Sequence, residues 1–171
     1  PHWNDYAWYW KKEATDWGWD WASEKDKPLH PKYAPVNRYA TDIIGCLNNW
    51  VDGWIDWNMV LDRQGGPNWF KNWCVAPILV DDKNDEVYFT PLYYVMAHFS
   101  KFMRPGAVKI GCTTDNKEII ATAVKNLDGS IAIAVFNPTE RIQTIAIQLN
   151  KKNKMITIDA NALQTIIIKS N

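Results

Sequence analysis

The eleven tryptophans of this chain are confined to its first half. All of them lie between Trp3 and Trp73, whereas the tail that begins at Ala107 is rich in isoleucine and valine. A chain of 171 residues ordinarily forms one domain, but such a change in side-chain usage indicates two packing units. We therefore predict one unit over residues 1–106 and a second over residues 107–171.

The tail has the two-residue period of β-strands. Ile120–Val124 and Ile131–Val135 alternate in this way and flank the turn signal Asp128-Gly129, which predicts a hairpin. Further strands are expected over residues 142–149, 155–158 and 163–168. Five or six short antiparallel strands predict a β-sandwich. Catalytic residue types are not concentrated on these strands, so a structural role is favoured for this unit.

Residues 37–102 contain two stretches whose apolar residues have helical spacing, with a short apolar run between them. The apolar positions 39, 43, 44 and 47 predict a helix over residues 37–50, with Asn37 as its cap. Residues 51–58 predict a strand buried on one face, and residues 91–102 predict a helix that ends before Pro105-Gly106.

Aromatic side chains are mixed with side chains that end in an amide or a carboxylate between positions 54 and 68. The residues concerned are Trp54, Asp56, Trp57, Asn58, Asp62 and Asn68. A pyranose ring has a face of C–H groups and a rim of hydroxyls, so a sugar site needs aromatic platforms together with amide and carboxylate partners. The alternative is that the two tryptophans belong to the core and that Asp56 is a satisfied buried carboxylate.

Several function classes are disfavoured by composition and charge. The net charge is zero and no basic stripe is present, which argues against a nucleic-acid partner. No apolar run approaches the roughly 20 residues of a membrane span. The three cysteines and three histidines lack ligand spacing, so we expect free buried thiols, no metal and no cofactor. Pro1 has no preceding methionine, so we expect the true start to lie upstream, and both secretion and a cytoplasmic location stay open.

Four separate blocks of this sequence resemble one known family. They are Gly53–Asn58 (GWIDWN), Gly65–Asn72 (GGPNWFKN), Ala76–Val80 (APILV) and His98–Phe102 (HFSKF), the last followed by Arg104-Pro105-Gly106. In order and spacing they are similar to the C-terminal part of the glucosylceramidase-like family 30 glycoside hydrolases. The resemblance covers nearly all of this chain but less than half of a family member.

The resemblance implies an α/β plus all-β architecture, in which a (β/α)8 TIM barrel carries an antiparallel β-sandwich side domain. Residues 1–106 would supply the end of the barrel, from the loop after strand seven through strand eight and its helix. A whole barrel takes about 250 residues, so the remainder of the barrel would be an upstream segment or another chain. We expect the strand over residues 51–58 to be paired on both sides by segments outside this sequence.

The resemblance also implies where the chemistry lies. Retaining glycosidases need two carboxyl groups about 5 to 5.5 Å apart. The family's acid/base glutamate lies far upstream of the matched region, and its nucleophile ends strand seven. We place the nucleophile upstream of Pro1, with Glu24 as the weaker in-chain candidate, so the fragment alone is expected to be inactive.

By the same resemblance, this chain keeps part of the substrate wall. Trp57 matches the tryptophan that stacks on the bound sugar, Asn72 matches an active-site asparagine, and Trp73 lies where the family has an aromatic neighbour. Asp56 matches a buried aspartate that holds structure, and Trp54 and Asn58 are structural residues near the site. We expect Asp56 to be held by arginine, lysine or backbone donors, and Trp57 and Asn72 to face a shared cleft.

The aromatic opening over residues 1–37 predicts a long, partly helical loop. Its tryptophans would either wall a sugar cleft or fix the loop to a scaffold. For the chain as a whole we predict the C-terminal portion of a retaining β-glycosidase acting on glucosylceramide or related glycans. The alternatives are a noncatalytic carbohydrate-binding module and a structural sandwich domain.

Overall fold

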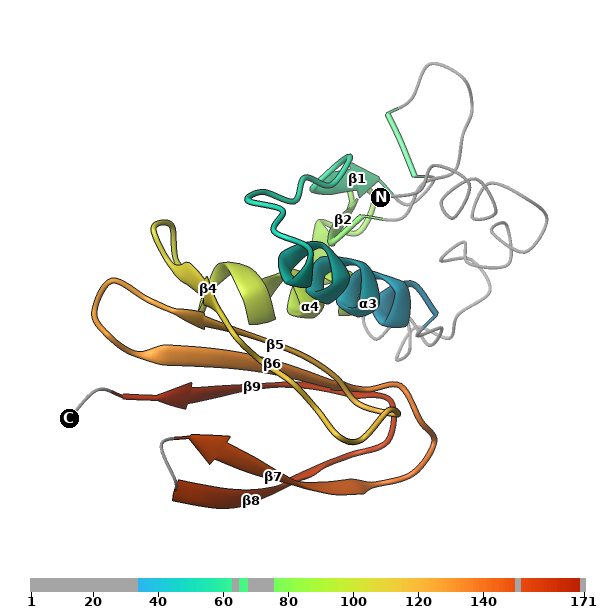
Figure 1. The fold of residues 1–171 in the computed structure, drawn as a ribbon. Coiled ribbons are helices and arrows are strands. Elements are labelled where there is room, and N and C mark those ends of the chain that lie inside the picture. The colour runs from blue at the N-terminus through green and yellow to red at the C-terminus, as the bar shows by residue number, and fades with distance from the viewer. Residues whose placement is uncertain (1–33, 63–64, 68–75, 150–151, 170–171) are drawn as a thin grey trace. The chain divides into compact units, whose positions relative to one another are not determined.

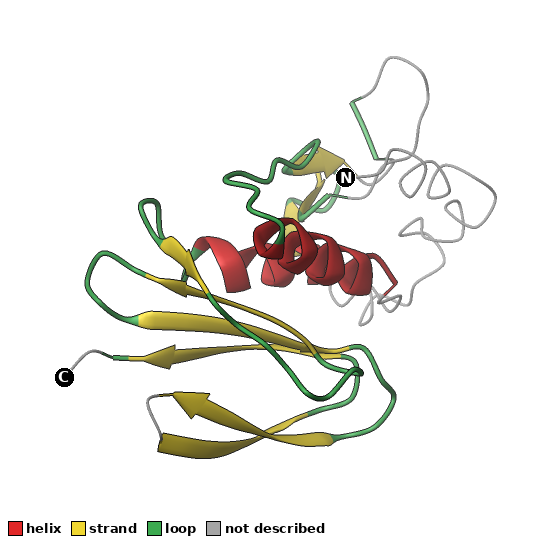
Figure 2. Ribbon diagram, viewed as in Figure 1, coloured by secondary structure: helices red, strands yellow, loops and turns green. Residues whose placement is uncertain are grey.

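The computed structural model describes residues 34–62, 65–67, 76–149 and 152–169 (Figure 1). By its internal contacts the chain divides into two compact units. The first contains Pro1–Tyr39 and Ile55–Met96, and the second contains Ala40–Trp54 and Ala97–Asn171. The described residues combine two helices with nine strands (Figure 2).

The two described helices are those that the apolar spacing predicts. Helix α3 spans Ala34–Asn48 and helix α4 spans Pro91–Ser100, so each ends two residues earlier than expected. The predicted cap at Asn37 is wrong, because the helix begins at Ala34 and Asn37 lies within its first turn. The buried Oδ1 atom of Asn37 accepts no hydrogen bond from any described residue.

A three-stranded sheet forms the described centre of the first unit. Strand β1 (Val60–Asp62) runs parallel to β2 (Ile78–Asp81), and β2 runs antiparallel to β3 (Glu86–Phe89), in the order β1-β2-β3. One face of this sheet buries a small cluster of Leu61, Ala76, Leu79 and Tyr88. Polar turn residues join β2 to β3, and Asp81 accepts bonds from the Lys83 and Asn84 backbone amides there.

Residues Val51–Asn58 form no strand with any other described residue, and the first described strand begins only at Val60. The expected pairing of this segment with strands outside this sequence stays a prediction. A strand needs a neighbour that satisfies its backbone N–H and C=O groups, and β2 is in register with residues 60–62 alone. The alternation that suggested a strand is nevertheless present, because exposed and half-buried side chains follow one another from Trp54 to Met59.

Two antiparallel sheets make up most of the second unit. The strands are β4 (Val108–Ile110), β5 (Ile120–Lys125), β6 (Ile131–Asn137), β7 (Gln143–Leu149), β8 (Lys152–Ile158) and β9 (Ala162–Ile168). One sheet has the order β4-β5-β6-β9, and the other consists of β7 and β8. The predicted hairpin is confirmed as β5 and β6, with Gly129 at φ 79° in its turn. The three further strands are confirmed as β7, β8 and β9.

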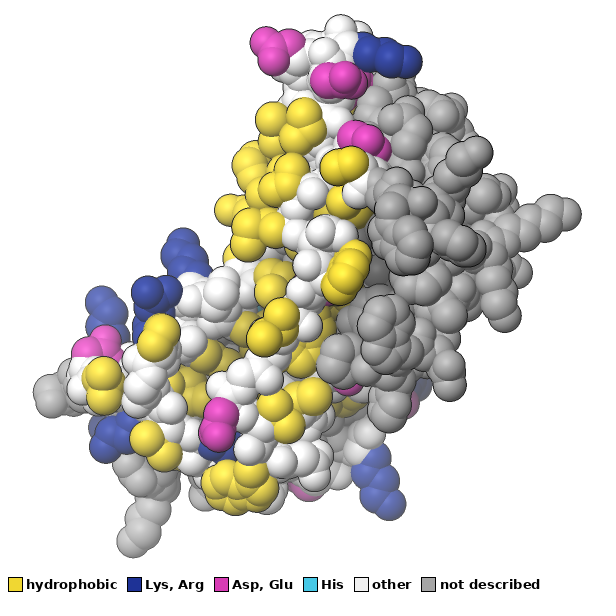
Figure 3. Space-filling model, turned by 90° about the horizontal axis from the view of Figure 1, so that it is seen from above, with side chains coloured by type: hydrophobic (Ala, Val, Ile, Leu, Met, Phe, Trp, Pro, Cys, Tyr) yellow, Lys and Arg dark blue, Asp and Glu magenta, His cyan; other side chains and the backbone are white. Residues whose placement is uncertain are grey.

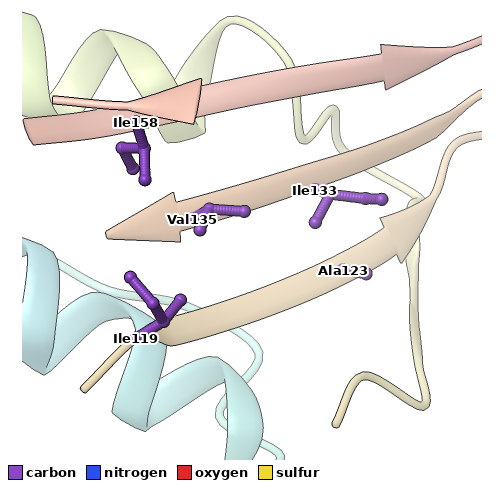
Figure 4. Packing of buried hydrophobic residues seen from close by; sticks show 5 residues of the cluster. All are labelled: Ile119, Ala123, Ile133, Val135 and Ile158. Atoms are coloured by element: carbon purple, nitrogen blue, oxygen red, sulfur yellow. The ribbon is translucent and has the colours of Figure 1, made fainter. Parts of the chain in front are cut away.

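The core of the second unit lies between its two sheets. Its buried members are Ile119, Ala123, Ile133, Val135 and Ile158 (Figure 4). Ile145 and Ile147 of β7 and Ile166 of β9 pack against this cluster while staying partly exposed. The alternating pattern of β7 explains this packing, because its isoleucines face inward and the residues between them face solvent.

Polar side chains tie the helical part of the second unit to its four-stranded sheet. The Asn48 amide donates to the carbonyl of Ala121 at 2.9 Å, and the Nδ1 atom of His98 lies 2.9 Å from the Thr165 hydroxyl. Asn126, at the start of the hairpin turn, donates to the Phe102 carbonyl at 3.0 Å. Short side chains thus fix the ends of both helices to strands far away in the sequence.

Candidate functional site

The candidate segment begins where helix α3 stops. The Val51 amide donates to the Cys46 carbonyl at 3.1 Å, and the Trp50 amide to the Leu47 carbonyl at 3.4 Å. This bonding pattern is a Schellman motif, in which the residue after the cap adopts the left-handed conformation. Trp50 takes that position with φ 64°, although glycine is the usual residue there. The chain therefore leaves the helix at a defined angle.

Beyond this turn, side chains alternate between exposed and half-buried positions. Ile55 is 85% exposed, Trp57 77% and Met59 68%, whereas Trp54, Asp56 and Asn58 are half-buried. Hydrophobic side chains also gather on the face drawn in Figure 3. Trp57 is therefore an exposed side chain in the described part of the chain, and its role as a sugar platform stays a prediction.

The half-buried Asp56 carboxylate connects this segment to helix α3. Its Oδ2 atom accepts a hydrogen bond from the Tyr39 hydroxyl at 2.7 Å, and its Oδ1 atom accepts one from the Trp57 amide at 2.8 Å. The expected backbone donor is present. Among the described residues, the bonds to Asp56 do not come from an arginine or a lysine. The second carboxylate oxygen, Oδ2, instead accepts a bond from the neutral hydroxyl of Tyr39. Burial raises the pKa of Asp56, and the bonds from Tyr39 and the Trp57 amide lower it in part.

The neighbouring Trp54 is anchored in the second unit. Its indole Nε1 donates to the Asp42 carboxylate at 2.7 Å, which satisfies the polar atom of a half-buried side chain. The indole of Trp54 is thus bonded to a side chain of helix α3, and the structural role expected for it stays a prediction. Asn58 is half-buried in the first unit.

Asp62 organises the start of the Gly-Gly-Pro loop. Its Oδ1 atom accepts a hydrogen bond from the Gly66 amide at 2.7 Å, and its backbone amide donates to the Gly66 carbonyl at 2.7 Å. Gly65 adopts φ 70°, which a side chain would disfavour. The turn that leads toward Asn72 and Trp73 is thus held by a carboxylate at the end of β1.

Three of the predicted site residues, Glu24, Asn72 and Trp73, lie outside the described residues, as does Asn68. The expected shared cleft of Trp57 and Asn72 therefore stays a prediction. In the described ranges, His, Cys, Asp and Glu side chains form no group of three or more that would hold a metal ion. Cys46 and Cys112 are free and only half-buried, and burial raises the pKa of the Cys112 thiol. Within the same ranges no helix is long and apolar enough to cross a membrane.

Sequence reasoning missed Tyr39 as a site residue. Its place in the apolar series of helix α3 suggested packing alone, and its side chain is indeed 4% exposed. A tyrosine on such a face still carries a hydroxyl that needs a partner when buried. That requirement is the signal that could have paired it with a nearby carboxylate.

Comparison with protein families gives the class of this chain. The glycosyl hydrolase family 30 TIM-barrel domain matches residues 21–103, and the family 30 beta sandwich domain matches residues 106–166. The chain therefore belongs to glycosyl hydrolase family 30. It combines the C-terminal piece of the family's TIM barrel with the family's β-sandwich.

Individual relatives agree with this assignment. A Caenorhabditis elegans protein named for glucosylceramidase activity is 37% identical over 150 residues, which cover 84% of this chain and 29% of that protein. The lysosomal acid glucosylceramidase of Mus musculus is 37% identical over 101 residues, or 58% of this chain and 20% of its own length. An endo-1,6-beta-D-glucanase of Trichoderma harzianum is 30% identical over 113 residues, which cover 63% of this chain and 23% of that enzyme.

Solved structures show the same relationship. SrfJ from Salmonella typhimurium superposes with a TM-score of 0.77 at 27% identity, over 79% of this chain and 30% of SrfJ. An endo-beta1,6-glucanase superposes with a TM-score of 0.70 at 25% identity, over 78% of this chain and 31% of that enzyme. The chain thus spans less than a third of each of these relatives.

Proposed function

We propose that this chain is the C-terminal portion of a retaining β-glycosidase that hydrolyses β-glucosides such as glucosylceramide or related glycans. In this proposal residues 1–106 belong to the catalytic barrel and residues 107–171 form its side domain. Trp57, Asn72 and Trp73 contribute one wall of the substrate site. The substrate is a carbohydrate or a glycolipid.

The observation that carries this proposal is the position of Trp57. The residue is 77% exposed, while its backbone amide is bonded to a carboxylate that also accepts a bond from Tyr39 of helix α3. Stacking on the C–H face of a sugar requires an exposed aromatic ring whose backbone is fixed by hydrogen bonds, and Trp57 has both features. Packing alone does not explain it, since the ring covers little of the described chain.

The inward carboxylates of the first unit support a catalytic pair elsewhere. Asp56 binds Tyr39 and the Trp57 amide, Asp62 binds the Gly66 amide, and Asp81 caps the turn after β2. Each of these groups is engaged in holding local structure. On the resemblance to the family, we place both catalytic glutamates in a segment N-terminal to Pro1, with Glu24 as the in-chain alternative for the nucleophile.

Strand β1 suggests how the rest of the barrel would join. It lies at the edge of the sheet β1-β2-β3, and its one partner among the described residues is the parallel strand β2. A TIM barrel is closed by parallel strands on both sides of every member. We infer that the side of β1 away from β2 pairs with a barrel strand supplied by an upstream segment or by another chain.

A second substrate class is favoured by two relatives. Endo-1,6-β-glucanases occur among both the sequence relatives and the structural neighbours of this chain. A glucosidase for a glycolipid and an endo-glucanase share the need for a glucose ring on an aromatic platform. Hydrolysis of glucosylceramide and of a β-1,6-glucan by the complete protein would separate the two.

The test uses the complete protein and a nitrophenyl β-glucoside. Trp57→Ala should lower kcat/KM by about 10- to 100-fold, with KM raised, because the sugar loses its platform, while Trp57→Phe should keep part of the activity. Ile55→Ala is the matched control, since Ile55 lies two positions earlier, is also largely exposed and has no proposed contact with sugar.

The same experiment separates the alternatives. Product of retained anomeric configuration, observed by NMR, supports the two-carboxylate mechanism. Sugar binding without hydrolysis in the complete protein would favour a noncatalytic carbohydrate-binding module. A loss of stability in Trp57→Ala, with kinetics of the remaining folded protein equal to those of Ile55→Ala, would favour a structural role.

A further inference from the structure

Tyr39 and Trp57 are connected through one carboxylate within the first unit. The Tyr39 hydroxyl donates to Oδ2 of Asp56 at 2.7 Å, and Oδ1 of Asp56 accepts from the Trp57 amide at 2.8 Å. Tyr39 and Asp56 are separated by 17 positions in sequence. The two oxygens of a single side chain therefore join helix α3 to the backbone of the candidate sugar platform.

The anchor acts on the backbone of Trp57 rather than on its indole. Because the residue is 77% exposed, contacts of the ring with the described residues do not fix its place. Tyr39, in contrast, is 4% exposed and lies in a helix, so its hydroxyl is a rigid reference point. A binding group is held best when the groups behind it are fixed by packing and hydrogen bonds.

We propose that Tyr39 is a positioning residue for sugar binding, which acts through the Asp56 carboxylate on the backbone of Trp57. This inference rests on the proposed function, in which Trp57 is the sugar platform. Tyr39 itself does not touch the substrate. Loss of its hydroxyl leaves one carboxylate oxygen without its donor and lets the Asp56–Trp57 segment shift.

The electrostatics of Asp56 supply a readout that packing does not. Burial raises the pKa of this carboxyl, and the donors Tyr39 and Trp57 N–H oppose that shift. The charged side chains on the same stretch of helix α3 are Arg38 and Asp42. The causes of the Asp56 pKa shift are burial first, then the bonds from Tyr39 and from the Trp57 amide. Removal of the Tyr39 hydroxyl should raise the pKa of Asp56 further, so the carboxylate would become protonated at a higher pH.

The experiment compares Tyr39→Phe with Tyr94→Phe in the complete protein, with a nitrophenyl β-glucoside as substrate. Tyr94 is the matched control, because it is an exposed tyrosine on helix α4 whose ring makes an edge contact with Tyr93. Tyr39→Phe should raise KM about three- to tenfold with a smaller change in kcat, as expected when a charge-assisted hydrogen bond that positions a binding group is lost. The acidic limb of the kcat/KM profile should also move to higher pH, whereas Tyr94→Phe should change neither quantity.

Asp56→Asn is the second variant, and it keeps the test decisive if Tyr39→Phe does not fold. Its amide does not titrate, so KM should rise and the part of the acidic limb due to Asp56 should disappear. Adding Tyr39→Phe to Asp56→Asn should then change KM little further, because both act on one link.

Two outcomes would overturn the proposal. If Trp57→Ala raises KM but Tyr39→Phe matches Tyr94→Phe in KM and in pH profile, Tyr39 has no positioning role and the sugar platform stands. If Trp57→Ala behaves like Ile55→Ala, Trp57 is not the sugar platform, and the positioning role proposed for Tyr39 is refuted as well.

Discussion

Asn137 is the buried polar side chain whose replacement should damage the sandwich most. It lies at the end of β6 and is 0% exposed. Its Nδ2 atom donates to the carbonyls of Arg141 at 2.7 Å and Asp159 at 2.8 Å. Its Oδ1 atom accepts from the Thr139 amide at 3.1 Å and from the Thr139 hydroxyl at 2.7 Å. One side chain thus fixes the loop after β6 and the turn between β8 and β9.

The substitution Asn137→Asp keeps the shape and removes both donors. Two hydrogen bonds worth about 1 kcal/mol each are lost, and an oxygen then faces the two carbonyl oxygens. The Asp159 carbonyl loses its side-chain donor, at about 1 to 3 kcal/mol, whereas the Arg141 carbonyl still lies 3.2 Å from the Thr139 hydroxyl. We expect a total loss of about 3 to 6 kcal/mol at neutral pH. Asn137→Ala should cost less, about 2 to 4 kcal/mol, because it leaves unmet groups but introduces no repulsion.

Urea denaturation of the complete protein, followed by circular dichroism, would measure the difference. With an m-value of about 1 to 3 kcal/mol/M, a loss of this size lowers the midpoint by more than about 1 M. Asn153→Asp, at an exposed position of β8, is the control and should change stability by less than about 0.5 kcal/mol. A loss for Asn137→Asp no larger than that of Asn153→Asp, or smaller than that of Asn137→Ala, would refute this reasoning.

Substitutions at three further residues test individual side chains. Thr122 is fully buried and its hydroxyl has no partner among the described residues, so Thr122→Val should stabilise the protein by about 1 kcal/mol in the same assay, and a loss would contradict this. Trp50 is 78% exposed and has a left-handed backbone with φ 64°, which glycine adopts without strain. Trp50→Gly should therefore stabilise the protein by about 1 kcal/mol, and Trp50→Ala should not. Equal effects of the two substitutions would show that the backbone of Trp50 is not strained. Burial lowers the pKa of His98, so the unfolded state binds its proton more tightly than the folded state. The stability that neutral His98 contributes should be complete above pH 6.5 and should be lost as the pH falls through the lowered pKa of the folded state. His98→Asn should therefore make Tm depend less on pH in this range. An unchanged dependence of Tm on pH would contradict this prediction.

Local sequence patterns predicted the sandwich because its strands are defined by local periods. Ile120–Val124 and Ile131–Val135 alternate over enough residues to be recognised, and Asp128-Gly129 supplies the turn. Strand β4 was missed because Val108–Ile110 is three residues long and sets no period. Strand β3 was missed for a related reason, since one residue of Glu86–Phe89 is buried and its neighbours are exposed.

The candidate segment was harder to predict because its structure depends on distant partners. Residues 51–58 have the alternation of a strand, yet strand formation requires a paired neighbour, which the sequence period does not identify. The family resemblance supplied the role proposed for Trp57. The bond between Tyr39 and Asp56 spans 17 positions, and no local pattern links a helix hydroxyl to a carboxylate in the following loop.

The most direct test is a crystal structure of the complete protein with a bound glucose-containing ligand that it does not hydrolyse. We predict that the C–H face of the sugar ring stacks on the indole of Trp57, at about 3.5 to 4.5 Å between carbon atoms, with Asp56 still bonded to the Trp57 amide behind it. A sugar bound away from Trp57, or an indole covered by the protein's own side chains in the complete enzyme, would contradict the proposed substrate wall.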